Sequence, residues 1–251
     1  MAKSRQFVLI TGAAGAIGRA TVERFKDAGF TVIGLDRDPA ISAMANGDCY
    51  GEQVDIGNAA ALAQVVQRFR PQGELQHAIS IAGGALPEEP LQQNDPALLD
   101  PTVFERSIHN NLTTHFLLLH ALLPWLREGS GRDRSITFTS SFNALSGWGM
   151  PAYSAAKAGL LGMMNALVTP LGASNIRTNV VAPGTIRTPR TERIWQHEPK
   201  HFESLEKTSA LARLGTPKDV ADAFFAIATL LTHVTGQVLV VDGGQMVKRC
   251  A

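Results

Sequence analysis

The stretch Phe7-Val8-Leu9-Ile10-Thr11-Gly12-Ala13-Ala14-Gly15-Ala16-Ile17-Gly18 joins a short apolar run to a glycine-rich turn. A nearly continuous apolar run is typical of a β-strand buried on both faces, as in a parallel sheet covered by helices. Glycines permit a tight turn and a close approach of the backbone to pyrophosphate, and the N-terminus of the next helix favours negative charge. The stretch therefore predicts a strand, a dinucleotide-binding turn and a helix, and a tight turn without a ligand is the alternative. The predicted contacts in the turn are Gly12, Gly15, Ala16, Ile17 and Gly18.

Short β-rich runs alternate with longer helical patterns along the chain. The expected strands are Gln6–Thr11, Thr31–Leu35, Cys49–Val54, Leu75–Ile81, Ser135–Ser140, Ile176–Ala182 and Val238–Val241. The expected helices are Ala16–Ala28, Ala59–Phe69, Pro101–Arg127, Pro151–Gly172 and Pro217–Leu231, the third and the last with N-caps at Asp100 and Thr216. This order predicts one α/β domain over residues 1–251, a doubly wound Rossmann-type fold with a seven-stranded parallel sheet and helices on both faces.

Two segments interrupt this alternation. Gly83–Asp100 is rich in proline, glycine and acids. Arg187–Leu214, at about residues 187–214 of the domain, is a long insertion of polar and aromatic residues. Long loops in compact domains are often lids or binding loops. We expect both segments to be loops that border a substrate pocket.

The composition excludes several classes of partner. The 251 residues are 45% hydrophobic and 18% charged, with a net charge of +1 and no marked cluster of lysine and arginine. Nucleic acid and anionic membranes are therefore not expected as main partners. The two cysteines, Cys49 and Cys250, indicate neither a disulfide framework nor a metal site. No window reaches the ~18 apolar residues of a membrane span, and the N-terminus lacks the pattern of a signal peptide, so we expect a cytoplasmic protein.

Asp36 closes the second expected strand, 18 residues after Gly18. An acid there can hydrogen-bond the 2′-hydroxyl of the adenosine ribose and repel a 2′-phosphate, which favours NAD over NADP. Arg37 is the contrary sign, and a plain strand-end turn is the alternative for Asp36. After the third strand, Asp55 and Ile56 are expected at the adenine, although a helix N-cap explains Asp55 nearly as well.

Tyr153 and Lys157 lie four residues apart in an expected helix, so that their side chains share one face. A nearby cation favours the phenolate and lowers the pKa of a phenol, which then exchanges a proton with an alcohol or carbonyl oxygen. The pair predicts redox chemistry if a hydride carrier is bound. A surface Tyr-Lys pair is the alternative for the motif alone.

Together these residues resemble the short-chain dehydrogenase/reductase family, over essentially the whole chain from Thr11 to Gly244. The motifs follow in the family's order: the Thr-Gly-x-x-x-Gly-x-Gly turn, Asp36, Asn111, Ser140-Ser141, Tyr153-x-x-x-Lys157, Asn179–Gly184 with Thr188, and Val240–Gly244. Their joint occurrence is specific, although no single motif is.

The resemblance implies a nicotinamide-dependent oxidoreductase with the catalytic residues Asn111, Ser141, Tyr153 and Lys157. Tyr153 would be the general acid/base, and Ser141 would bond the substrate oxygen. Lys157 would bind the nicotinamide ribose and lower the pKa of the tyrosine, and Asn111 would distort its helix and hold a water in a proton relay. The further cofactor contacts that the resemblance implies are Ala82 and Gly83 beside the adenosine ribose, and Pro183, Gly184, Ile186 and Thr188 at the nicotinamide end, with Tyr153 and Lys157.

Several alternatives stay open. Asn110 neighbours Asn111, but the family's Asn-Leu-x-x-x-Phe pattern matches the sequence that begins at Asn111. Ser141 lies twelve residues before Tyr153, whereas Ser140 gives the family's commoner spacing of thirteen. The sequence Ser80-Ile81-Ala82-Gly83 departs from the family's Asn-Asn-Ala-Gly, whose asparagine ties neighbouring strands, and Ser80 is expected to replace part of that bond.

We therefore expect an NAD(H)-dependent alcohol dehydrogenase or carbonyl reductase that interconverts a small-molecule secondary alcohol and ketone. The resemblance also implies a homotetramer. The pocket is expected to be apolar and aromatic, with polar lid residues beside it: Phe142, Leu145, Trp148, Met150 and Trp195, then Arg193, His197 and His201. The alternatives are a reductase of another carbonyl class such as 3-oxoacyl thioesters, or a non-enzymatic NAD-binding regulatory protein. The resemblance disfavours an enoyl reductase, which typically has a longer Tyr-to-Lys spacing, and an epimerase, which is usually a longer chain.

Overall fold

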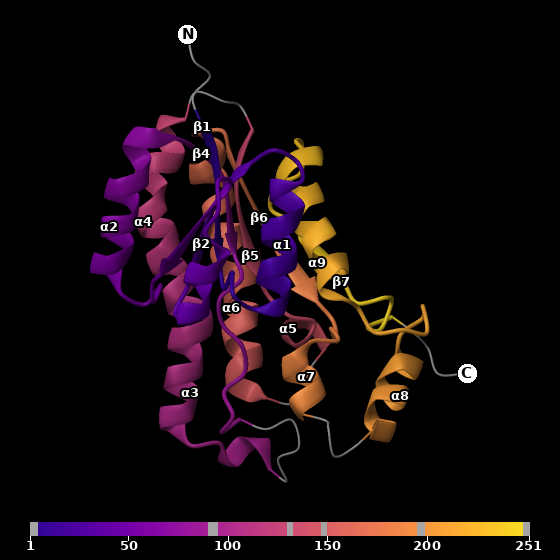
Figure 1. Ribbon diagram of the computed structural model, residues 1–251. Coiled ribbons are helices and arrows are strands. Elements are labelled where there is room, and N and C mark those ends of the chain that lie inside the picture. The colour runs from indigo at the N-terminus through magenta and orange to yellow at the C-terminus, as the bar shows by residue number, and fades with distance from the viewer. Residues whose placement is uncertain (1–4, 90–94, 130–132, 147–149, 195–198, 248–251) are drawn as a thin grey trace.

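A computed structural model describes residues 5–89, 95–129, 133–146, 150–194 and 199–247 of the chain. In these residues all strands pair in parallel in one seven-stranded sheet with the order β3-β2-β1-β4-β5-β6-β7 (Figure 1). The strands are β1 (Arg5–Thr11), β2 (Thr31–Asp36), β3 (Cys49–Gln53), β4 (Gly73–Ser80), β5 (Arg134–Thr139), β6 (Ile176–Pro183) and β7 (Val238–Val241). The order of strands reverses between β1 and β4, and ligands of such sheets bind at that point, beyond the carboxyl ends of the strands. The predicted doubly wound fold is confirmed.

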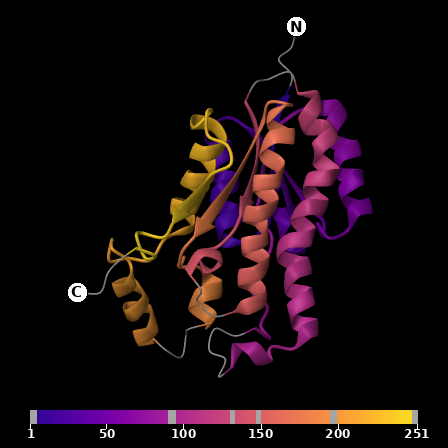
Figure 2. The ribbon, with the colours of Figure 1, turned by 180° about the vertical axis from the view of Figure 1, so that it is seen from behind.

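Helices cover both faces of the sheet (Figures 1 and 2). One face carries α2 (Ala59–Phe69), α4 (Thr114–Glu128) and α6 (Pro151–Gly172), and the other carries α1 (Ala16–Lys26) and α9 (Pro217–Phe225). Successive side chains of a strand point to opposite faces, so Phe7 and Leu9 join the first apolar core while Val8 and Ile10 join the second. The continuous apolar run of β1 is therefore required by burial on both sides.

The helix boundaries follow local capping chemistry. Asp100 Oδ1 accepts the N–H of Thr102 at 2.8 Å at the start of α3 (Pro101–Ile108). Thr216 and Asp219 form a reciprocal capping box at the start of α9. Both predicted N-caps are confirmed. The single helix predicted over Pro101–Arg127 is interrupted, because a π-helical turn over His109–Thr113 separates α3 from α4.

The expectation of a loop over Arg187–Leu214 is wrong for much of that segment. It contains α7 (Pro189–Ile194) and α8 (Pro199–Thr208), which lie with α5 (Asn143–Ser146) near the carboxyl ends of the strands (Figure 1). Proline is favoured in the first turn of a helix, where its missing N–H costs nothing, and both helices begin with one. The predicted pocket residues Trp148, Trp195 and His197 lie outside the described residues.

Candidate active site

The turn between β1 and α1 has the shape of a phosphate cradle. Gly12 has a φ of +66°, and a Cβ built on it would lie 2.9 Å from the nitrogen of Ala82. A Cβ on Gly18 would lie 2.0 Å from the carbonyl oxygen of Gly12. In the described residues no side chain caps α1 at Gly15, and its first turn holds no acid. The uncapped N–H groups and the bare backbone fit a pyrophosphate group.

Asp36 lies at the end of β2, next to this turn. Its Oδ2 accepts the N–H of Ala14 at 2.9 Å and its Oδ1 accepts the N–H of Asp38 at 3.0 Å. These bonds fix the carboxylate beside the turn. A cation that the sequence did not suggest lies at the same place, because Arg19 Nε donates to the carbonyl oxygen of Ala14 at 2.8 Å. Arg37, the residue after Asp36 in the chain, is exposed.

The segment after β3 rules out the alternative that Asp55 is the N-cap of the next helix. Asp55 Oδ1 accepts the N–H of Gly57 at 2.8 Å, and the N-cap of α2 is Asn58, whose Oδ1 accepts the N–H of Ala61 at 3.1 Å. Asp55 is therefore not the N-cap, and its exposed carboxylate stays a predicted adenine contact. Ile56 is buried in the apolar core, which leaves its main chain as the predicted contact.

Two threonines tie the carboxyl end of β4 to its neighbours in the sheet. Thr11 Oγ1 accepts the N–H groups of residues 81 and 82 at 3.0 and 3.1 Å. Thr139 Oγ1 donates to the carbonyl oxygen of Ser80 at 2.8 Å. The Ser80 hydroxyl itself lies 2.6 Å from Nδ1 of the buried His115. The expectation that the Ser80 side chain replaces the family's asparagine is therefore wrong, because the threonines make this connection.

Asn111 is fully buried in the π-helical turn between α3 and α4. Its Oδ1 accepts the N–H of Gly84 at 2.7 Å, and its Nδ2 donates to the carbonyl oxygens of Gly84 and Ser107 at 3.1 and 3.0 Å. The predicted distortion of the helix is present, and π-helical turns often mark functional sites. The amide is used to anchor the Gly83–Gly84 segment, so a role in holding a water stays a prediction.

The two serines after β5 contact different partners. Ser140 Oγ donates to the carbonyl oxygen of Lys157 at 2.8 Å. Ser141 Oγ donates to Asn143 Oδ1 at 3.2 Å and also hydrogen-bonds the phenol of Tyr153. This geometry favours Ser141 over Ser140 as the predicted catalytic serine, because Ser141 contacts the phenol of Tyr153.

Burial and three neighbouring residues shift the pKa of the Tyr153 phenol. Burial raises the pKa of Tyr153, the hydrogen bond from Ser141 and the charge of Arg190 lower it, and the charge of Glu89 raises it. Lys157 Nζ lies 5.7 Å from the centroid of the phenol ring. The expected lowering of the pKa of this phenol is therefore wrong for this structure, because desolvation of the phenolate outweighs the hydrogen bond from Ser141 and the charge of Arg190.

Lys157 is 2% exposed, and its Nζ donates to the carbonyl oxygen of Thr139 at 2.8 Å. Burial lowers the pKa of Lys157 to about 7. An amine with that pKa exchanges protons near neutral pH, which suits the predicted role of Lys157 beside Tyr153.

The buried amine of Lys157 should make stability depend on pH. Replacing Lys157 by methionine is expected to raise the free energy of unfolding below about pH 7, by on the order of 2 kcal/mol, because the folded wild type buries an ammonium group there. The pKa falls from 10.5 to about 7 on folding, so below pH 7 both states hold the proton and the full cost is present. Above pH 7 the folded state releases the proton, and the advantage of the variant shrinks towards pH 10.5.

Urea unfolding of wild type and Lys157→Met at about pH 6 and about pH 9 measures this difference. The exposed Lys218, which pairs with Asp222, offers a matched control as Lys218→Met. The control is expected to show no comparable change with pH. If Lys157→Met raised the free energy of unfolding by the same amount at both pH values, the result would contradict the lowered pKa of Lys157.

The segment after β6 lies beside the same end of the sheet. A Cβ on Gly184 would lie 2.6 Å from Cβ of Asp242, so glycine is required for this close approach. Thr188 and Thr191 exchange hydrogen bonds, each N–H donating to the other's Oγ1, at 2.9 and 3.2 Å. This pairing fixes the start of α7. The nicotinamide contacts stay predictions for Pro183, Gly184, Ile186 and Thr188.

Two charged residues near Tyr153 were not predicted. Glu89 is 1% exposed and accepts the main-chain N–H of Tyr153. Arg190 of α7 donates to the carbonyl oxygen of Ala85. The only signal for either was the expectation that their two segments border the substrate pocket.

The expected pocket residues divide by exposure. Phe142 and Met150 are buried at 7% and 8% exposure, whereas Leu145 is 38% exposed. Arg193 is also exposed, as expected of a lid residue, and α8 carries His201.

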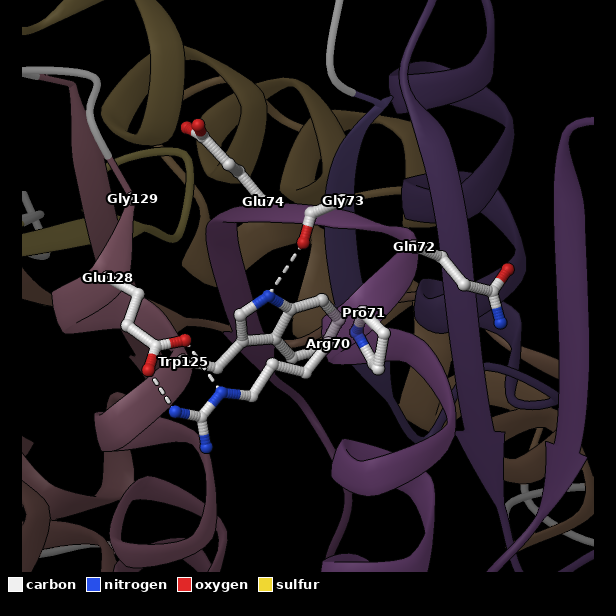
Figure 3. Close-up of a pocket in the computed structure, with 8 residues that line it drawn as sticks. All are labelled: Arg70, Pro71, Gln72, Gly73, Glu74, Trp125, Glu128 and Gly129. Carbon is white, nitrogen blue, oxygen red and sulfur yellow. Dashed lines mark hydrogen bonds and ion pairs between the residues drawn. The ribbon is translucent and has the colours of Figure 1, made fainter.

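A cavity of about 260 Å³ lies elsewhere, at the amino end of β4 (Figure 3). Trp125 donates to the carbonyl oxygen of Gly73 at 2.9 Å there, and Arg70 pairs with Glu128 at its rim. It contains none of the predicted site residues.

The described residues contain no group of three or more His, Cys, Asp or Glu side chains that could hold a metal ion. They also contain no helix long and apolar enough to cross a membrane.

Comparison with known proteins gives consistent matches over nearly the whole chain. The model of the family described as enoyl-(acyl carrier protein) reductase matches residues 12–246. A solved structure of an oxidoreductase of the short chain dehydrogenase/reductase family from Burkholderia thailandensis has a TM-score of 0.87 and 34% identity, covering 98% of this chain and 94% of that chain.

Relatives with named activities also match nearly the whole chain. The (2S)-[(R)-hydroxy(phenyl)methyl]succinyl-CoA dehydrogenase subunit BbsD of Thauera aromatica is 32% identical and covers 98% of each chain. The 3-oxoacyl-[acyl-carrier-protein] reductase FabG of Thermotoga maritima is 30% identical over 95% of this chain and 97% of its own.

Proposed function

This chain belongs to the short-chain dehydrogenase/reductase family, and we propose that it interconverts a secondary alcohol and a ketone by hydride transfer with NAD(H). The observation that carries the proposal is the meeting of Tyr153, Ser141 and Lys157 at the carboxyl end of β5 and the start of α6. This group lies next to the strand end that contacts the glycine turn.

In the oxidation of an alcohol, Tyr153, Ser141 and Lys157 have separate roles. Tyr153 Oη, as the phenolate, takes the proton of the substrate hydroxyl. A nicotinamide bound beside it would supply the acceptor for the hydride that leaves the carbinol carbon. Ser141 Oγ donates a hydrogen bond to the substrate oxygen as negative charge develops there. Lys157 Nζ exchanges the proton onward, and reduction of the ketone uses the same groups in reverse.

We propose NAD rather than NADP as the partner, because the fixed carboxylate of Asp36 would repel a 2′-phosphate. Replacing Asp36 by serine is expected to shift the ratio of kcat/KM for NADP over NAD upwards by about tenfold or more, which corresponds to about 1.4 kcal/mol. Arg19 and Arg37 would then be available to a 2′-phosphate without the charge of Asp36.

Initial rates with both dinucleotides measure this shift, and Asp38→Ser is the matched control, since Asp38 caps the next turn instead. A wild type that prefers NADP would contradict our interpretation of Asp36.

A reductase of 3-oxoacyl thioesters is the second candidate. It is supported by the relatives from Thauera aromatica and Thermotoga maritima, whose names specify CoA and acyl-carrier-protein thioesters. A panel of secondary alcohols with NAD, of ketones with NADH, and of 3-oxoacyl thioesters with NADH separates the two, read as change in the absorbance of the reduced nicotinamide. Turnover of simple alcohols and ketones supports the first proposal. Turnover confined to thioesters supports the second, and inertness throughout would contradict both.

We also propose a homotetramer. The α3–α4 helices and α6 stand next to each other on one face (Figure 2), and the aromatic rings of Phe104 and Phe116 are 39% and 49% exposed on α3 and α4. Exposed aromatic side chains on adjoining helices favour contact with another subunit. Light scattering is expected to return close to four times the chain mass of 26.9 kDa. A mass near that of one chain would contradict this assembly.

A further inference from the structure

Glu89 carries a charged group in an unusual place. Its side chain is 1% exposed, although carboxylates are rarely buried without partners. Within the described residues it takes part in no ion pair with a lysine, arginine or histidine. In the described residues its carboxylate accepts hydrogen bonds from two donors, the main-chain N–H of Tyr153 and the hydroxyl of Ser107.

Those donors belong to two helices that meet beside the proposed catalytic group. The two carboxylate oxygens of Glu89 lie 3.0 and 3.2 Å from the main-chain nitrogen of Tyr153, whose N–H they accept. Oε2 also accepts the hydroxyl of Ser107 in α3 at 3.3 Å. One carboxylate thus connects α3, α6 and the segment that follows Gly83–Gly84.

Among the described residues, the start of α6 has no capping side chain at its N-cap position. Met150 is the N-cap residue and has a φ of 49°, and its own side chain makes no capping hydrogen bond. Pro151 and Tyr153 are the first and third helical residues, so the N–H of Tyr153 is one of the groups that an α-helix leaves without an internal partner. Glu89 supplies the acceptor from a distant segment, and its charge suits the positive end of the helix.

The same carboxylate acts on the phenol of Tyr153. Its charge raises the pKa of Tyr153, against the lowering by Ser141 from the end of β5 and by Arg190 from α7. Lys157 on α6 faces the phenol ring at 5.7 Å. His115 on α4 is the further titratable group of this cluster, and the charge of Lys157 helps to lower the pKa of its imidazole.

We propose that Glu89 is a positioning residue for Tyr153, which caps α6 at the main chain of the tyrosine and thereby fixes where its hydroxyl stands. The proposal rests on the proposed function of Tyr153 as the acid/base. Losing the contact lets the first turn of α6 move, and small displacements of a reacting group have large effects on rate.

A spectroscopic test is possible because the chain has only two tyrosines, Tyr50 and Tyr153. In a Tyr50→Phe background, the absorbance of tyrosinate as a function of pH reports Tyr153 alone and needs no substrate. Adding Glu89→Gln is expected to move this titration to lower pH, because it removes the charge that disfavours the phenolate. Adding Glu88→Gln is the matched control, since Glu88 is exposed and pairs with Arg106, and it is expected to leave the titration in place.

Kinetic measurements separate the effect of the position of Tyr153 from the effect of the charge of Glu89. Glu89→Gln is expected to lower kcat about tenfold with little change in KM, and its pH profile is expected to shift in the same direction as the titration. Glu89→Asp keeps the charge but is one methylene group shorter, so kcat is expected to fall while the phenol titrates close to its original value. Urea unfolding of each variant identifies any that fail to fold, in which case the other two still decide.

The inference is overturned if Glu89→Gln and Glu88→Gln give the same titration and the same kcat. If the wild type turns over no alcohol or ketone, the proposed function fails, whereas the titration still tests the contact between Glu89 and Tyr153.

Discussion

Replacing Tyr153 by phenylalanine is expected to lower kcat by about a thousandfold and to leave the affinity for NADH nearly unchanged. General acid/base catalysis contributes ~10²–10⁴ in rate, and the substitution removes only the oxygen that would carry the proton. The ring beside Lys157 and the start of α6 remain, because Glu89 binds the main chain of this residue rather than its side chain.

Initial rates with the best substrate from the panel of alcohols and ketones measure kcat. Fluorescence titration measures the affinity for NADH. Tyr50→Phe is the matched control, because Tyr50 packs against Phe7 and Phe69 at the start of β3, away from the site. It is expected to retain full activity. A Tyr153→Phe enzyme as active as this control would remove the tyrosine from the mechanism.

The second large effect is expected at the glycine turn. Replacing Gly18 by alanine is expected to lower the free energy of unfolding by about 2 to 4 kcal/mol and to weaken NADH binding by about tenfold or more. The added Cβ would lie 2.0 Å from the carbonyl oxygen of Gly12 and 2.7 Å from Cα of Ala13. Both are main-chain atoms that no rotamer change can move, so α1 must shift away from the turn that would hold the pyrophosphate.

Gly172→Ala is the matched control for this substitution. Gly172 ends α6, and a Cβ there would meet nothing within 4 Å. Alanine in an open helical position is expected to stabilise by about 0.5–1 kcal/mol. Equal unfolding midpoints and equal NADH affinities for the two variants would show that the close contact at Gly18 does not hold the turn in shape.

Much of the fold could be predicted because its signals are local. The bounds of α2 and α6 and of β7 match the predicted ranges, and the caps at Asp100 and Thr216 lie where predicted. Apolar runs without alternation indicated strands buried on both faces, and the two apolar cores show that burial.

The errors in the fold come from features that periodicity does not record. A π-helical turn inserts one residue into a helical repeat, so the pattern over Pro101–Arg127 still read as one helix. The helices α7 and α8 are short and largely polar, and their polarity suggested a loop although Pro189 and Pro199 mark their starts.

The site was predicted where one motif holds both partners and missed where segments far apart meet. Tyr153 and Lys157 share one helix, so their spacing was informative. Glu89 reaches the N–H of Tyr153 across 64 residues, and Arg190 reaches Ala85 across 105. No spacing rule relates such residues. The raised pKa of Tyr153 was missed for the same reason, because burial is a property of the assembled fold.

Transfer of deuterium from a labelled alcohol to the dinucleotide tests the central claim most directly. A secondary alcohol deuterated at its carbinol carbon would be mixed with the enzyme and NAD, and the reduced dinucleotide examined by NMR. The account predicts one deuterium on the nicotinamide ring for each alcohol oxidised with wild type, and no detectable transfer in the same time with Tyr153→Phe. Reduced dinucleotide that carries only solvent hydrogen, or equal transfer by the variant, would contradict it.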